Sequence, residues 1–178
     1  MTDPRSQSTY QVRLAWGQQG LERLAPAGIV VIVDVLGSSD ELAAAAAALE
    51  NGPTVFQGTL RNATATAKAI YDEQRARGGR TAISLVLAGD DGAFAVEDYL
   101  AAGAIGDALS ALGLDHSAPD VAVATEGFRP LTRALKHLLS ASAAGLALAE
   151  EGRRDVVRAA AELDAEDHPT RVVTAEED

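Results

Sequence analysis

The chain has 178 residues, 47% hydrophobic and 23% charged, which is typical of a folded globular protein and not of a disordered one. Its 15 basic and 26 acidic side chains give a net charge of −11, which disfavours binding to nucleic acid or to anionic membrane lipid. Cysteine is absent, which excludes disulfides, thiolate metal sites and cysteine nucleophiles, so we expect a soluble, cytoplasmic protein.

Strands and helices are predicted to alternate along most of the chain. A flexible lead is expected over residues 1–9, followed by a single domain over residues 10–178. Apolar or β-branched runs predict strands at residues 10–16, 28–36, 54–57, 81–89 and 171–174. Helices are predicted between them at residues 21–24, 38–52, 61–77 and 95–113, and repeatedly from residue 119 to residue 164. This order predicts an α/β protein with three α/β/α layers and a mainly parallel central sheet.

Three carboxylates are placed near the ends of predicted strands. Asp34 ends the apolar run at residues 28–36, where a charge costs stability unless it has a partner. Glu97 and Asp98 follow the strand at residues 81–89, in the first turn of the next helix. Ligands bind beyond the carboxyl ends of such strands, and a group of carboxylates suits Mg²⁺, which offers phosphate a positive centre. Alternatively, Glu97 and Asp98 only favour the positive end of their helix.

Two further segments are candidates for substrate binding. Arg61 and Asn62 open the helix at residues 61–77, where a guanidinium and free backbone N–H groups could bind phosphate. The alternative is that Asn62 or Thr59 caps the helix and Arg61 is a solvated surface group. Ser38 and Ser39 could donate to an oxyanion, although Ser38 with Glu41 also matches a helix capping box.

Four ordered motifs resemble the 2-phosphosulpholactate phosphatase family. They are VVIVDVLGSS, TLRNATATA, LAGDDGAFAVEDYLAAGAIGDAL and AAGLALAEEGRRDVVRAAAELD, and they cover most of the chain. The resemblance implies a layered α/β/α fold and Mg²⁺-dependent hydrolysis of 2-phosphosulpholactate, a small phosphorylated anionic metabolite. It also implies that Asp34, Glu97 and Asp98 are catalytic and bind the metal ion, and that Arg61 and Asn62 belong to the site.

The sequence also departs from the family pattern. Gly37 stands where a basic or bulky residue is common, Thr59 where Cys is frequent, and Ala144 and Leu146 where the late motif has Ser and Arg. A middle segment before the strand at residues 54–57 is missing. A catalytically impaired member that acts as a binding or assembly protein is therefore the alternative, and a phosphoacceptor of the receiver type is a weaker third hypothesis. Because only 4% of residues are aromatic, we also expect a homodimer, or a protein partner if the chain is inactive.

Overall fold

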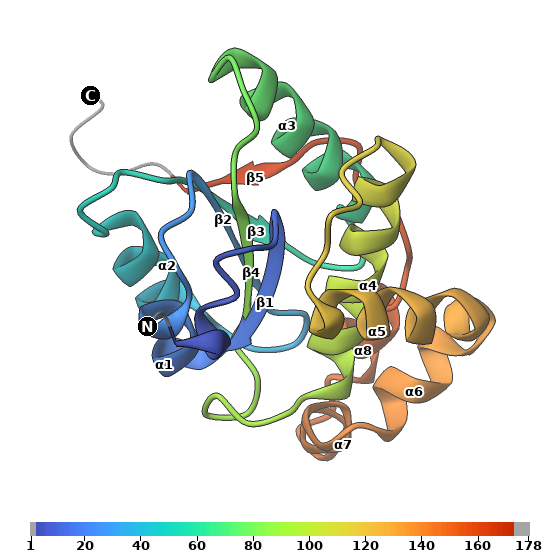
Figure 1. The fold of residues 1–178 in the computed structure, drawn as a ribbon. Helices are drawn as coiled ribbons and strands as arrows, with labels where there is room; N and C mark the ends of the chain where they lie inside the picture. Colours follow the sequence, from blue (N-terminus) through green and yellow to red (C-terminus); the bar gives the residue numbers. More distant parts are fainter. Residues whose placement is uncertain (1–2, 173–178) are drawn as a thin grey trace.

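A five-stranded sheet lies at the centre of the protein in a computed structural model that describes residues 3–172 (Figure 1). The strands follow the order β1-β4-β2-β3-β5, and all pairs are parallel except β3 with β5. The strand bounds are β1 Val12–Trp16, β2 Ile29–Val33, β3 Thr54–Gly58, β4 Ile83–Leu87 and β5 Thr170–Arg171. The predicted α/β class and mainly parallel sheet are confirmed.

Helices cover both faces of the sheet (Figure 1). α1 and α2 lie on one face, and α3, α4 and α5 lie on the other, with α6, α7 and α8 farther out on that side. The bounds are α1 Gly17–Arg23, α2 Asp40–Ala47, α3 Ala63–Ala76, α4 Val96–Ala111, α5 Pro119–Phe128, α6 Leu135–Ala141, α7 Ala143–Glu150 and α8 Arg154–Ala160. A 3₁₀ helix at Arg129–Ala134 links α5 to α6. The arrangement is the three-layer α/β/α fold.

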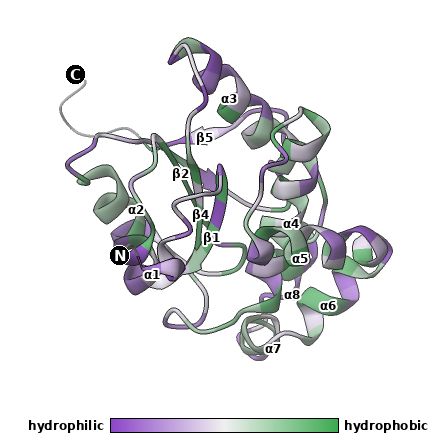
Figure 2. Cartoon of the chain, in the orientation of Figure 1, coloured by the Kyte–Doolittle hydropathy of each residue, from purple (hydrophilic) through white to green (hydrophobic). Residues whose placement is uncertain are grey.

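The apolar run of β2 follows from its central position. Val31 packs into the core shared with α3 and α4, whereas Val30 and Ile32 pack into the core beneath α1 and α2. Both faces of the strand are therefore buried, which removes the usual alternation of polar and apolar residues. In Figure 2, β2 is hydrophobic, whereas the outer end of α3 is hydrophilic.

The contact between α4 and α5 depends on small residues. A Cβ atom added at Gly103 would collide with the carbonyl oxygen of Ala124, and one added at Gly106 would collide with the hydroxyl of Thr125. The two helices can therefore approach closely only with glycine at these positions. The segment AAGAIG thus has a packing role in positioning the start of α4.

Residues 3–9, within the expected flexible lead, lie against the domain. They include a 3₁₀ helix at Pro4–Ser6, and Ser6 is buried. The Gln7 side chain donates to the carbonyl of Leu14 at 2.8 Å and accepts from its N–H at 3.0 Å. This reciprocal pair covers the outer edge of β1 at Leu14, while the same edge is paired at Val12 with the backbone of residues 116–118.

Two local predictions need adjustment. The capping box of Ser38 and Glu41 is wrong, because α2 begins at Asp40 and its N-cap residue, Ser39, makes no side-chain capping hydrogen bond. The last strand is present at Thr170–Arg171, antiparallel to β3, and the part predicted at residues 173–174 lies outside the described residues.

Candidate active site

A cleft of about 540 Å³ lies at the carboxyl ends of the adjacent strands β2 and β4. The chain leaves β2 toward α2 on one face and leaves β4 toward α4 on the other, so the loops separate at this point. Such a divergence is where open α/β sheets bind ligands. The lining residues are Asp34, Gly37, Gly89, Asp90, Phe94, Ala95, Val96, Glu97, Asp98, Ala143, Ala144 and Ala147. The three carboxylates predicted from the sequence therefore share one cleft.

Asp34 follows β2 directly, and its carboxylate contacts the loop that leads from Asp34 to α2. Its Oδ1 accepts a hydrogen bond from the backbone N–H of Gly37 at 2.7 Å. A Cβ atom at position 37 would lie 2.8 Å from Oδ1 and 3.0 Å from Oδ2. A side chain at this position would therefore displace either the loop or the Asp34 carboxylate, so the departure at Gly37 is part of the local geometry of the site.

Asp98 connects the two loops that form the cleft. Its Oδ1 accepts from the N–H of Val35, after β2, at 2.9 Å, and its Oδ2 accepts from the N–H of Gly89, after β4, at 2.8 Å. The residue is only 3% exposed. These contacts go to the loops rather than to the start of α4, so a preference for the positive end of the helix does not account for Asp98. Asp98 instead holds the cleft together.

The environment of Asp98 favours its neutral form. The pKa of this carboxyl is raised from 3.8 to about 7, mainly by burial and to a smaller extent by the charges of Asp34 and Glu97. The hydrogen bonds from Gly89 and Val35 act in the opposite direction because they stabilise the carboxylate. The net shift therefore comes mainly from the removal of Asp98 from water, and a bound cation beside it would lower the pKa again.

Glu97 differs from Asp98 in having no partner. It lies in the first turn of α4, is 5% exposed, and lines the cleft. Among residues 3–172, no hydrogen bond or ion pair involves its carboxylate. Among the described residues, the side-chain polar atoms that are fully buried without a partner belong to Ser6, Thr66 and Ser84, so the Glu97 oxygens still reach the space of the cleft. They are therefore available to a ligand.

The cleft offers ligand atoms of the kind that a hard cation prefers, but these atoms do not form a complete coordination shell. Carboxylate oxygens from Asp34 and Glu97 are the ligands that Mg²⁺ prefers, and this ion usually completes its shell with water. In the part of the chain that the structure describes, no three His, Cys, Asp or Glu side chains converge tightly enough to hold a metal ion. Binding would therefore rely on water and on a small adjustment of the carboxylates.

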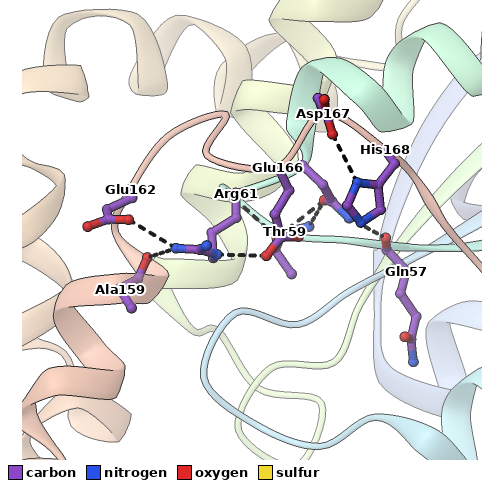
Figure 3. A network of polar contacts seen from close by, with 9 residues as sticks. Gln57, Thr59, Arg61, Ala159, Glu162, Glu166, Asp167 and His168 are labelled. Atoms are coloured by element: carbon purple, nitrogen blue, oxygen red, sulfur yellow. Dashed lines mark hydrogen bonds and ion pairs between the residues drawn. The ribbon is translucent and has the colours of Figure 1, made fainter.

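Arg61 lies outside the cleft and contacts the C-terminal segment (Figure 3). Its Nε donates to Glu166 at 2.8 Å, and its Nη1 donates to the carbonyl of Ala159 at 2.7 Å and to Glu162 at 3.2 Å. The guanidinium is thus already occupied by three acceptors.

Asp164 accepts from the N–H and the hydroxyl of Thr64, both at 2.8 Å, and so caps α3 from a distant part of the chain.

Asn62 stabilises the turn between β3 and α3. Its side chain accepts from the N–H of Thr59 at 2.8 Å and donates to the carbonyl of Gln57 at 3.2 Å. It is 2% exposed and makes no side-chain cap of its helix. Neither the predicted capping of α3 nor a free amide for phosphate matches this arrangement.

Ser38 and Ser39 line a second cavity of about 850 Å³, on the side of α1 and α2, which shares Gly89 with the acidic cleft. Substrate contacts by Ser38, Ser39, Arg61 and Asn62 stay predictions, since none of these side chains lines the acidic cleft.

The helix α7 supplies the remaining wall of the cleft through alanines. Ala144 lines the cleft, whereas Leu146 points into a separate cavity of about 270 Å³. Gly145 donates its N–H to Ser142 at 3.1 Å, and a Cβ atom there would collide with the carbonyl oxygen of Leu139. The glycine of the late motif thus allows the tight junction between α6 and α7.

Two lining residues, Asp90 and Phe94, were not singled out by sequence reasoning. Both belong to the loop between β4 and α4, and the Phe94 side chain is 63% exposed. A large apolar residue in a polar loop, three positions before Glu97, is the signal that could have identified Phe94.

Comparisons with known proteins agree with the motifs. The family model described as 2-phosphosulpholactate phosphatase matches residues 36–168, a range that includes Glu97 and Asp98 and begins two residues after Asp34. No curated protein shows a significant match. Among the described residues, none of the helices combines the length and apolar character needed to cross a bilayer. Because the family model covers most of its length, the chain belongs to the 2-phosphosulpholactate phosphatase family.

Proposed function

We propose that this family member is a Mg²⁺-dependent phosphomonoester hydrolase in which Asp34 and Glu97 hold the metal ion. The observation that carries the proposal is the Glu97 carboxylate, which belongs to a residue only 5% exposed, lines the cleft and has no partner within the described residues. Restricting the access of water to an unpaired carboxylate is unfavourable, and a cation between Glu97 and Asp34 would offset that cost. The Mg²⁺ ion would supply a positive centre for the phosphoryl group and would activate water.

Within this proposal, Asp98 acts mainly through the backbone. By accepting from both Val35 and Gly89 it fixes the distance between the loops that carry Asp34 and Glu97. Each of its oxygens keeps a second lone pair, so a contact with the ion or with a bound water is compatible with these hydrogen bonds. The Gly37 amide orients the Asp34 carboxylate in the same way.

Phosphate release in the presence of Mg²⁺ tests the proposal. Wild type should hydrolyse members of a panel of phosphomonoesters, and Asp34→Asn and Glu97→Gln should each lower the rate by about 100-fold or more. Glu41→Gln removes an exposed acidic charge on α2 outside the cleft and should leave the rate unchanged. Equal rates in wild type and both cleft variants would refute the proposed site.

One observation favours the alternative of a catalytically impaired binding or assembly protein. Arg61 is engaged by the C-terminal segment, and among the described lining residues the cleft has no Lys, Arg or His to bind phosphate directly. If wild type releases no phosphate and Mg²⁺ does not change its melting temperature, this alternative is the better account. Light scattering would then show whether the chain forms the expected homodimer or needs another protein.

A further inference from the structure

The acidic cleft has one aromatic wall. Phe94 lines it with 63% of its side chain exposed, next to Ala95 and Val96, and α7 adds the methyl groups of Ala144 and Ala147. An exposed ring of this size is unusual in a chain with only 3 Phe, 1 Trp and 3 Tyr residues. An exposed apolar surface beside convergent polar groups is characteristic of a ligand site.

Two neighbouring aromatic rings pack against the Phe94 ring. Trp16, at the end of β1, and Tyr99, in the first turn of α4, both lie 5.4 Å from it between ring centroids. Trp16 and Tyr99 also stack on each other at 6.1 Å. Because the ring is already ordered by its neighbours, a ligand that packs on it loses little side-chain freedom on binding.

The charges of the cleft oppose ligands with several anionic groups. Asp34, Asp90, Glu97 and Asp98 line it, and within residues 3–172 no basic side chain does so. A single bound Mg²⁺ ion could still coordinate one phosphate group, although the carboxylates that hold the ion offset its charge. Any further carboxylate or sulfonate, such as the two that 2-phosphosulpholactate carries beside its phosphate, would face these acids without a counter-charge.

Resting on the proposed function, we infer that the substrate is a phosphomonoester whose alcohol part is apolar and carries no further anionic group. Phe94 is its specificity-determining residue, because its ring and the alanines of α7 provide the surface for that alcohol part. The phosphate would lie toward Asp34 and Glu97, and the apolar part toward Phe94.

Calorimetric titration with three non-hydrolysable phosphonates in Mg²⁺ tests this inference without requiring turnover. The probes are propylphosphonate, 3-phenylpropylphosphonate and 4-phosphonobutanoate, which differ in a ring or a carboxylate at the far end. We expect the phenyl compound to bind about tenfold more tightly than propylphosphonate, and the carboxylate compound to bind more weakly. Phe94→Ala should abolish the preference for the phenyl compound over propylphosphonate, whereas Val123→Ala, at an equally exposed site outside the cleft, should preserve it.

A gain of function provides the second variant. Ala147 is exposed and lines the cleft, so Ala147→Arg should improve binding of 4-phosphonobutanoate about tenfold by supplying the missing counter-charge. Tighter wild-type binding of the carboxylate than of the phenyl compound, an unchanged ring preference in Phe94→Ala, or no binding of any probe would overturn the inference. Ring-dependent binding without any phosphate release would instead overturn the proposed function alone, and phosphate release without a ring preference would overturn the inference alone.

Discussion

The ionisation of Asp98 should make the stability of the protein depend on pH in a direction opposite to that of most carboxylates. Its pKa rises from 3.8 to about 7 on folding, mainly because the group is buried. Between these two values the folded protein binds one proton more than the unfolded chain, so the free energy of unfolding falls as the pH rises. The contribution is complete below about pH 4 and is lost as the pH passes about 7.

The magnitude follows from the size of that window. Each pH unit within it corresponds to about 1.4 kcal/mol, so between about pH 5 and pH 7 the folded state should lose about 3 kcal/mol from this group alone. Asp98→Asn cannot ionise and should lack this slope. The variant also turns an amide N–H toward Val35 or Gly89, which lowers stability by about 1–3 kcal/mol at every pH.

Urea unfolding of wild type and Asp98→Asn at several pH values, in the presence of a chelator, measures the effect. Taking the difference between the two proteins cancels other groups, including Glu73, whose pKa is lowered by its hydrogen bond from Thr54 and its pairing with Arg77. The wild-type advantage should shrink by about 3 kcal/mol from about pH 5 to pH 7. Parallel curves would refute the assignment of Asp98 as a buried, unneutralised carboxyl.

Four other substitutions should have distinct outcomes. Gly145→Ala should lower the free energy of unfolding by more than about 2 kcal/mol in urea titrations because its Cβ would collide with the Leu139 carbonyl, whereas Gly127→Ala, in open space within α5, should raise it by up to about 1 kcal/mol. Arg61→Ala should lower the melting temperature yet leave phosphate release unchanged, and a large loss of rate would place Arg61 in the site. Ser84→Ala should be neutral or stabilising in the same urea titrations, because this buried hydroxyl has no partner among the described residues, and clear destabilisation would indicate a partner not seen here.

The fold could be predicted because its signals are local. The apolar run of β2 and the glycines that end helices report burial and backbone geometry over a few residues, and Gly78 and Gly113, just after α3 and α4, both have left-handed backbone conformations. The predicted helix end at Gly52 was wrong, because α2 already ends at Ala47. The order of the strands is different, since β4 inserts between β1 and β2 through contacts that no single segment encodes. The capping box was wrong because Ser38 belongs to the loop that begins at Asp34, and α2 starts only after that loop, at Asp40.

The site could be predicted only as far as strand topology determines it. Asp34, Glu97 and Asp98 meet because parallel neighbouring strands end at the same edge of the sheet. The roles of the individual groups depend on contacts between distant segments. Asp98 binds backbone 63 residues away, and Arg61 binds Glu166, 105 residues away, so neither interaction is visible in a local pattern.

Direct titration of Mg²⁺ into the protein is the measurement that tests the central claim most directly. Calorimetry on wild type and on Glu41→Gln should show one Mg²⁺ bound per chain, and Glu97→Gln should show none, because the unpartnered carboxylate of the cleft is then lost. Binding of the same strength and stoichiometry in wild type and Glu97→Gln, or no binding to either, would contradict the account.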